Sequence, residues 1–431
     1  MKKLFRKIHL WLSIPFGLII AATCFSGAML VFETEITEWS HPARYFVEEV
    51  QEKPLPVGRL VKSVNAQLPD SLTVAGVQIP NNPKRNYRMS LAGQNRMAAV
   101  YVDPYTGDIR DLQLGTQKNF FTVMRRLHRW LLDDFKRDGG FSLGKTVVGI
   151  STLLFVFVLI AGIIVWMPRS KKTLFIRLKI RTKYGLKRFW HDLHVAGGIY
   201  AVVLLLAMAL TGLTWSFNWY RDGFYRVFGA EPPLMGQHGG TPAPQAVADS
   251  TTVIGSTINS EGKGGHPEYI GENQRESRGN RPENAGENRR EGRGNRGENH
   301  EGRGREGNGY GNGVNYRQWQ TVIDQLKMQY PKCKSITVQD GKASVSLSEY
   351  GNSRASDSYV FDSQSGDITE TKYYKNTDKS GKLRGWIYAV HVGSWGGTVT
   401  RILSFLAALL GTTIPLTGYY MWIKRLRKKN E

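Results

Sequence analysis

The sequence predicts an α-helical integral membrane protein with four transmembrane helices and two small external α+β domains, built on an internal duplication. Three observations predict this class: four long apolar runs, basic residues that crowd alternate connections, and two external segments that share one helix–strand plan. A length of 431 residues is too great for one ordinary domain. Only two cysteines occur, which excludes a disulfide scaffold, a zinc ribbon and a cysteine-ligated iron–sulfur cluster.

Each apolar run is free of Asp, Glu, Lys and Arg and is long enough to cross a bilayer, because about 20 helical residues span the ~30 Å hydrocarbon layer. The first run follows a basic stretch and is long for a signal peptide, so we expect a retained membrane anchor. The four runs are Leu10–Phe32, Thr146–Met167, Val195–Tyr220 and Ile402–Ile423.

The basic residues predict the orientation of these helices. They crowd the N-terminal flank from Lys2 to Lys7, the connection from Arg169 to Arg188 and the tail from Lys424 to Lys429. These flanks alternate with the spans, so the positive-inside rule places all three, and both termini, in the cytoplasm. The net charge of +22 is therefore a topology signal, and we expect no nucleic-acid partner. The predicted parts are transmembrane helices 8–32, 143–167, 191–220 and 398–423, external segments 33–142 and 221–397, the cytoplasmic loop 168–190 and the tail 424–431.

Both external segments show the same order of elements. A helical pattern comes first, three strand-like runs follow, and an Asp-x-x-x-Gly-Asp-Ile turn closes each series, at Asp103–Ile109 and Asp362–Ile368. The glycine supplies the positive φ that a hairpin turn needs. The predicted elements are helix 57–68 with strands near 73–79, 86–91 and 98–103, and helix 316–330 with strands near 334–339, 342–348 and 358–362.

The spans repeat as well. His9 precedes Gly27 by 18 positions, as His194 precedes Gly212, and a glycine stands four positions before Trp166 and again before Trp422. Spacings shared by two halves of one chain indicate an internal repeat.

Residues 236–313 form a tract rich in Gly, Asn, Arg and Glu with few apolar side chains, and we expect it to be a disordered spacer. Two GxGxxG sequences lie in it, at 292–297 and 302–307. Neither follows a predicted strand nor opens a helix, so neither predicts a dinucleotide site.

Five histidines lie at span ends, where each side of the membrane receives one histidine from each half of the chain. His9 and either His191 or His194 lie at the cytoplasmic side, and the repeat favours His194; His128 and His391 lie outside. Two helices that present one imidazole each suffice to hold a haem iron by both axial positions. A single interfacial histidine is more often a headgroup anchor, so the symmetric placement carries this interpretation.

Neighbouring residue types suit the same cofactor. Arg125, Arg126 and Arg129 offer planar donors for haem propionates. Glycines close to the histidines would let a flat ring approach the backbone; these are Gly17, Gly197 and Gly198 on the inner side and Gly393, Gly396 and Gly397 on the outer. A metal or siderophore permease is disfavoured, because the centres of the spans contain no His, Asp or Glu.

At these motifs the sequence resembles the PepSY-associated transmembrane helix family, over nearly the whole chain except 236–313. The resemblance rests on Lys7-Ile-His9-Leu-Trp-Leu12, Leu127-His128-Arg129-Trp130-Leu-Leu132, Asp192-Leu-His194 followed by Gly198, and His391-Val-Gly393. The two Asp-x-x-x-Gly-Asp-Ile turns resemble the closing hairpin of a PepSY domain, which makes the external domains PepSY-like.

The resemblance implies a protein of the bacterial inner membrane with a role in iron acquisition. Some members are ferric-siderophore reductases with two b-type haems, which implies haem b ligated by His9 with His194 and by His128 with His391. Electrons would come from a quinol or a cytoplasmic reductase and pass to ferric iron in an external siderophore or other chelate. The alternative is a non-enzymatic envelope protein whose PepSY domains bind peptides or regulate a peptidase. The metalloprotease motif HExxH is absent from the sequence.

Overall fold

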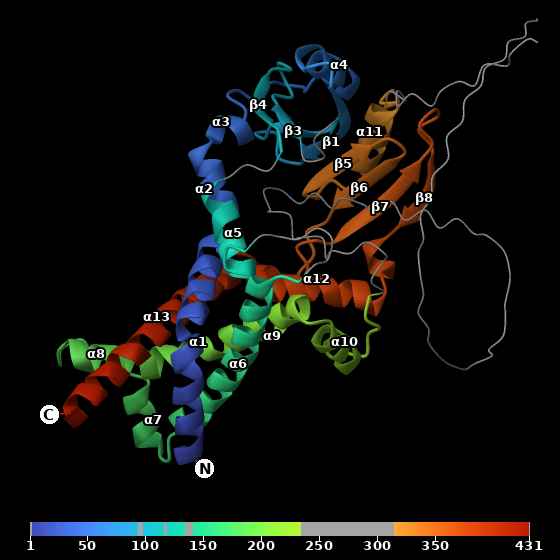
Figure 1. The fold of residues 1–431 in the computed structure, drawn as a ribbon. Helices are drawn as coiled ribbons and strands as arrows, with labels where there is room; N and C mark the ends of the chain where they lie inside the picture. Colours follow the sequence, from blue (N-terminus) through green and yellow to red (C-terminus); the bar gives the residue numbers. More distant parts are fainter. Residues whose placement is uncertain (1, 94–97, 116–118, 134–140, 234–313, 431) are drawn as a thin grey trace, which may run out of the picture. The chain divides into compact units, whose positions relative to one another are not determined.

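The computed structural model describes residues 2–93, 98–115, 119–133, 141–233 and 314–430 (Figure 1). The tract 236–313, which the sequence predicts to be a disordered spacer, lies outside the described residues, as do its two GxGxxG sequences.

Four helices in the described part of the chain are long and apolar enough to cross a membrane, which confirms the four predicted spans. They are α1 (Lys2–Val31), α6 (Leu143–Trp166), the helix Leu186–Ser216 and the helix Ser394–Arg427. The third consists of α8 (Leu186–Asp192), a π-helical turn at Leu193–Gly197 and α9 (Gly198–Ser216). The fourth is a 3-10 turn at Ser394–Gly396 followed by α13 (Gly397–Asn430).

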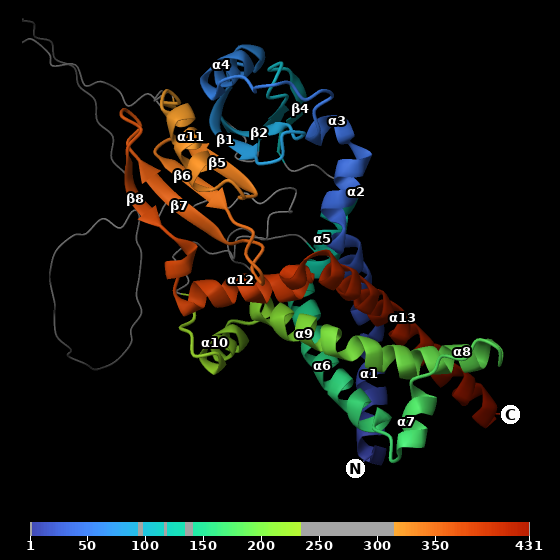
Figure 2. The same ribbon diagram turned by 180° about the vertical axis from the view of Figure 1, so that it is seen from behind.

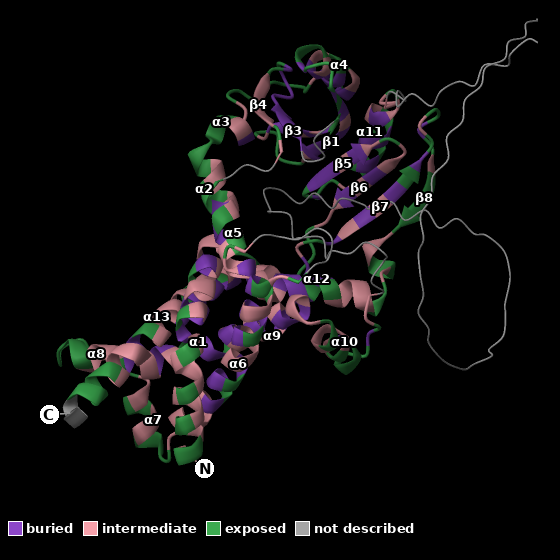
Figure 3. Ribbon diagram, in the orientation of Figure 1, coloured by how far each residue is buried: buried purple, intermediate pink, exposed green. Residues whose placement is uncertain are grey.

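The four spans form a bundle in which α1 packs on α6 and α13, and α9 packs on the same two helices (Figures 1 and 2). The seam contains small and aliphatic side chains such as Ala201, Leu205 and Ala407. Small residues let helix backbones approach closely in a membrane. Large apolar side chains of the spans are exposed, with Val203 73% and Trp11 70% exposed, as a lipid-facing surface requires. Figure 3 shows exposed and intermediate residues along α1 and α13.

The third apolar run ends earlier than its hydropathy predicts. Phe217 has extended backbone angles (φ −130°, ψ 128°), and a separate helix, α10 (Asn218–Val227), begins at the next residue. The apolar composition of the run continues through this break, so hydropathy alone does not locate it. Other short helices are α2 (Glu33–Ser40), α3 (Pro42–Tyr45) and α7 (Lys171–Arg177).

The two segments that the sequence predicts to be external contribute to one eight-stranded antiparallel sheet, in the order β4-β3-β2-β1-β5-β6-β7-β8. Each segment supplies one helix and four strands, and the buried faces of α4 and α11 share a core with the sheet, centred on Leu60, Val77 and Trp319. The first set is α4 (Val57–Gln67), β1 (Leu72–Pro80), β2 (Tyr87–Gly93), β3 (Ala99–Val102) and β4 (Ile109–Gln113). The second is α11 (Trp319–Gln329), β5 (Ser335–Gln339), β6 (Lys342–Ser346), β7 (Ser356–Phe361) and β8 (Ile368–Lys372).

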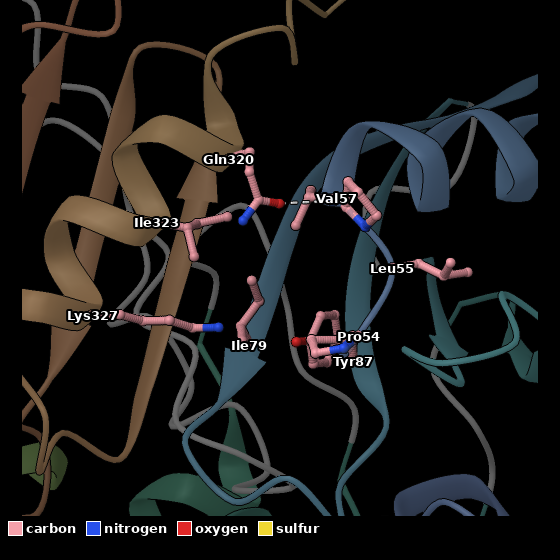
Figure 4. Close-up of a pocket in the computed structure, with 9 residues that line it drawn as sticks. Pro54, Leu55, Val57, Ile79, Tyr87, Gln320, Ile323 and Lys327 are labelled. Atoms are coloured by element: carbon pink, nitrogen blue, oxygen red, sulfur yellow. Dashed lines mark hydrogen bonds between the residues drawn. The ribbon is translucent and has the colours of Figure 1, made fainter. Parts of the chain in front are cut away.

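The two sets of strands meet where β1 pairs with β5, between Gly76–Pro80 and Ser335–Gln339. A β-carbon at Gly76 would lie 2.7 Å from Gln339 Cγ and 3.0 Å from the Val338 carbonyl oxygen, so a side chain does not fit at this junction. The backbone N–H of Val57 donates to Gln320 Oε1 at 2.9 Å, beside a cavity of about 240 Å³ (Figure 4).

The repeated Asp-x-x-x-Gly-Asp-Ile sequences form the same turn in both halves. Gly107 and Gly366 have φ of 81° and 84°, and their N–H groups donate to the carbonyl oxygens of Asp103 and Asp362. The Asp362 carboxylate accepts from the N–H groups of Ser365 and Gln364, which holds its pKa below the ordinary value.

Two further helices flank the spans and were not predicted as separate elements. In α5 (Phe120–Trp130), the Asn119 side chain accepts from Thr122 N–H at the start of the helix. In α12 (Lys379–Val392), Asp378 accepts from Gly381 N–H, and Gly393 ends the helix with φ 75°. A 3-10 turn at Tyr374–Asn376 precedes α12. These two helices carry His128 and His391.

Candidate functional site

We call His9 with His194 the inner pair and His128 with His391 the outer pair, after the sides of the membrane that the sequence predicts for them. The inner pair is formed by two spanning helices from opposite halves of the chain. His9 lies on α1, and His194 lies in the π-helical turn between α8 and α9. The ring centres are 6.2 Å apart and the ring planes are nearly perpendicular, at 85°. Single π-helical turns inside α-helices occur frequently at functional sites.

The outer histidine pair, His128 and His391, joins α5 to α12. Its ring centres are 6.0 Å apart, with an interplanar angle of 59°. The indole of Trp215 lies edge-on to His391 at 5.0 Å between centres. The structure thus brings together the two sets of histidines that the sequence predicts as pairs.

In each ring, Nδ1 lies within hydrogen-bond distance of a backbone carbonyl oxygen on a spanning helix. His9 is bonded to Val158 at 3.0 Å, His194 to Ile414 at 3.1 Å, His128 to Thr23 at 2.8 Å and His391 to Met208 at 2.9 Å. A carbonyl only accepts, so Nδ1 carries the proton in all four rings. The lone pair is then on Nε2, and a second-shell carbonyl of this kind is what fixes the tautomer of a metal-ligating histidine.

Every one of these carbonyls stands four residues, about one helical turn, before a glycine against which the same ring packs. A β-carbon would lie 3.5 Å from Cε1 of the inner rings and 3.0 Å from Cε1 of the outer rings. The glycines are Gly162 for His9, Gly418 for His194, Gly27 for His128 and Gly212 for His391. Glycine at these points gives each ring access to the carbonyl of the preceding turn.

The spacing of the rings fits a shared metal ion. A metal–imidazole bond is about 2 Å long and the ring centre lies about 1 Å beyond the nitrogen, so two axial imidazoles have centres about 6 Å apart. The observed 6.2 and 6.0 Å agree with that separation. Within the described residues the structure contains no group of three or more His, Cys, Asp or Glu placed to hold a metal.

His191, the alternative inner ligand, is paired with Asp192. Its side chain is 53% exposed and its Nδ1 lies 3.2 Å from Asp192 Oδ1, in a cluster with Arg188. His194 is three residues further along the chain, within the π-helical turn, and faces His9 instead.

The three predicted arginines have different surroundings. Arg125 forms an ion pair with Glu33 at 2.5 Å, and Arg126 donates to the Leu132 carbonyl oxygen at 2.9 Å. Arg129 is partly buried with its guanidinium 4.4 Å from the Trp130 ring centre, and the described residues give it no ion pair. Of the three, Arg129 is thus the cation next to His128 that remains available to an anionic group.

The glycines that contact the imidazole rings differ from the glycines named in the sequence analysis as allowing a haem to approach the backbone. Gly17 faces the Tyr419 ring, Gly197 faces Leu410, and Gly393 packs on Ser404 at the end of α12. The glycines that do contact the imidazole rings are Gly27, Gly162, Gly212 and Gly418, which the sequence analysis identified only by their repeated spacing. Their function was missed because each ring contacts a helix far from it in sequence.

A comparison with protein-family models matches residues 6–425 to the model described as the PepSY-associated TM region. A comparison with curated proteins finds no match. The family match covers nearly the whole chain, including both histidine pairs. The chain therefore belongs to the family of PepSY-associated transmembrane regions.

Proposed function

We propose that this protein is a di-haem electron-transfer protein of the bacterial inner membrane that reduces ferric iron held by external siderophores or other chelates. The observation that carries the proposal is the occurrence of two imidazole pairs, each with centres about 6 Å apart and each with Nδ1 bonded to a carbonyl. A haem b bound at each pair would supply a one-electron redox centre.

The chain's own residues hold and orient the four imidazoles. The carbonyls of Val158 and Ile414 set the ring orientation at the inner pair, where Thr417 Oγ1 also lies 2.9 Å from His194 Nδ1. At the outer pair, Arg129 would neutralise a propionate. All four histidines are only partly exposed in the structure.

The positions of the pairs suit transfer across the bilayer. Along α1, the inner ligand His9 and the outer contact Gly27 are separated by 18 residues, or about 27 Å of helix. This distance approaches the ~30 Å thickness of the hydrocarbon layer. In the proposed orientation the basic helix ends and both termini face the cytoplasm. Electrons from a quinol or a cytoplasmic reductase would therefore enter at the inner pair, and ferric iron outside would receive them.

We also infer that the two halves are duplicates and that the external modules are PepSY-like. The same four-residue relation between carbonyl and glycine occurs at all four rings, and the same turn closes both sets of strands.

Ferrous iron binds hard oxygen ligands less tightly than ferric iron does, so reduction would release the metal from its chelator.

The test is the dithionite-reduced minus air-oxidised spectrum of the purified full chain, with haem counted per chain by pyridine haemochrome. Two b-type haems are expected; His9→Ala and His128→Ala should each remove one. His191→Ala is the matched control, because this exposed histidine lies outside both pairs, and it should keep both. Preparations that form ferrous iron from a ferric chelate only when both pairs are intact would support the reductase activity.

A chain purified from haem-sufficient cells without a Soret band would overturn the proposal. The alternative, an anchored envelope protein with peptide-binding PepSY domains, would then account for the external sheet.

A further inference from the structure

A cavity of about 440 Å³ lies where the start of α1, the end of α6 and α7 meet. Five of its lining side chains are cations, and none of the described residues that line it is acidic. The cations come from three separate segments: Lys2, Lys3 and Arg6 from α1, Arg169 from the connection after α6, and Arg177 from α7. Membrane topology alone requires basic residues at this end of the helices but does not require them to surround one cavity.

Two of the cations are already fixed by the protein. The Lys2 ammonium donates to the Met167 carbonyl oxygen and the Arg177 guanidinium donates to that of Trp166. Both carbonyls belong to the C-terminal end of α6, where the helix dipole favours positive charge. These contacts hold α1 and α7 against the end of α6 and so keep the cavity walls together.

The other three cations are available to a ligand. Among the described residues, none forms a hydrogen bond or an ion pair with Lys3, Arg6 or Arg169. Cations that face one cavity repel one another, and an anion with several acceptor oxygens removes that repulsion. Phosphate matches this donor set, because guanidinium groups bind its oxygens in a bidentate manner.

The cavity also has an apolar wall, to which Val165 and Met167 contribute, and Met167 is 52% exposed. This wall continues into the apolar surface of α6, which crosses the membrane. A soluble phosphate would not contact the apolar surface. A phospholipid would place its phosphate among the cations and its acyl chains along the apolar wall.

We propose that this cavity binds the phosphate of an anionic phospholipid headgroup. The site is independent of the histidine pairs and of the haem proposal. A bound lipid would add to the contacts that already hold α1 and α7 against the end of α6.

The test is native mass spectrometry of the full chain in detergent, titrated with phosphatidylglycerol and, separately, with zwitterionic phosphatidylcholine. The wild-type chain should retain phosphatidylglycerol selectively. In Arg6→Gln/Arg169→Gln its affinity should fall roughly thirtyfold, since each cation near a phosphate contributes about a factor of five. The control Arg425→Gln/Arg427→Gln removes the same charge from exposed positions outside the cavity and should leave the affinity within about twofold of wild type.

Equal losses in the two double variants would overturn the proposal, because they would show attraction to surface charge alone. Displacement of the lipid by millimolar inorganic phosphate would reassign the cavity to a free anion. Haem content is measured on the same samples: loss of haem from Arg6→Gln/Arg169→Gln would show that the cations serve the cofactor instead. If that variant does not fold, Lys3→Glu, at an exposed position, is expected to weaken lipid binding, and unchanged binding would refute the site.

Discussion

A methyl group at Gly27 gives a sharp test of how the outer pair is held. The new β-carbon would lie 3.0 Å from His128 Cε1, whereas carbon atoms in contact are ordinarily about 3.5–4.0 Å apart. The His128 ring must therefore retreat by about 0.5 Å. At Gly162 the same β-carbon would lie 3.5 Å from His9 Cε1, an ordinary contact, so Gly162→Ala is the matched control at the inner pair.

The expected effect follows from this displacement. Ligand constellations need placement within about 0.5 Å, and disturbing the groups that orient a ligating histidine typically costs tenfold or more in metal affinity. If haem binds at the outer pair as proposed, Gly27→Ala should weaken its retention there about tenfold, or about 1.4 kcal/mol. Both substitutions replace a helical glycine by alanine and gain similar helix propensity, so that gain cancels in the comparison.

The assay measures haem loss from purified protein to an excess of a haem-scavenging apoprotein. The wild-type chain and Gly162→Ala should release both haems slowly, and Gly27→Ala should release one of the two in a faster phase. Gly212→Ala should behave like Gly27→Ala, because its β-carbon would lie 3.0 Å from His391 Cε1. Equal behaviour of Gly27→Ala and Gly162→Ala would refute the assignment of these glycines to the ring contacts.

The remaining predictions concern charge, packing and pH. Arg129→Gln should lower haem occupancy at the outer pair several-fold and leave the contribution of the inner-pair haem to the difference spectrum unchanged. Equal loss of haem at both pairs would contradict a role of Arg129 at the outer pair alone. Thr417→Val removes the hydroxyl bonded to His194 Nδ1 and should weaken haem retention at the inner pair by about 1 kcal/mol, measured by the same scavenger assay; an effect at the outer pair would be inconsistent. Gly76→Ala should lower the unfolding free energy of the sheet by about 1–3 kcal/mol, measured in denaturant titrations with proteolysis as the readout. The control Gly58→Ala, with open space around its β-carbon, should not destabilise the sheet. Burial and the hydrogen bonds to Asp357 and Tyr359 raise the pKa of Tyr330. The stability that Tyr330 confers is therefore complete below the unfolded tyrosine pKa of about 10 and is lost as pH rises above that value. In thermal unfolding, Tyr330→Phe should reduce this alkaline loss of stability, and an unchanged pH profile would exclude Tyr330 as its source.

The membrane architecture could be predicted because it follows from composition along the chain. A stretch without charged residues has few stable environments besides a bilayer, so Leu10–Phe32 predicts a spanning helix without knowledge of its neighbours. Hairpin turns are equally local, since the positive φ of Gly107 and Gly366 is required by the turn itself.

Boundaries and separate short helices were harder to predict. The third run keeps its apolar composition through Phe217, where the backbone becomes extended, and α5 and α12 are recognisable mainly by single capping residues. Pairing of β1 with β5 joins segments more than 250 residues apart, and no local pattern encodes that contact.

For the candidate site too, the sequence predicts the residue types, and only the tertiary structure shows their contacts. Sequence symmetry selected His9, His194, His128 and His391, because similar motifs with similar spacing in the two halves can be recognised from the sequence alone. Only the tertiary structure showed that each ring reaches a carbonyl and a glycine on another helix, and that Arg125 is engaged by Glu33 whereas Arg129 is not. The physical reason is that residue type and spacing determine what a helix is able to present, whereas packing against distant helices determines which atoms it meets.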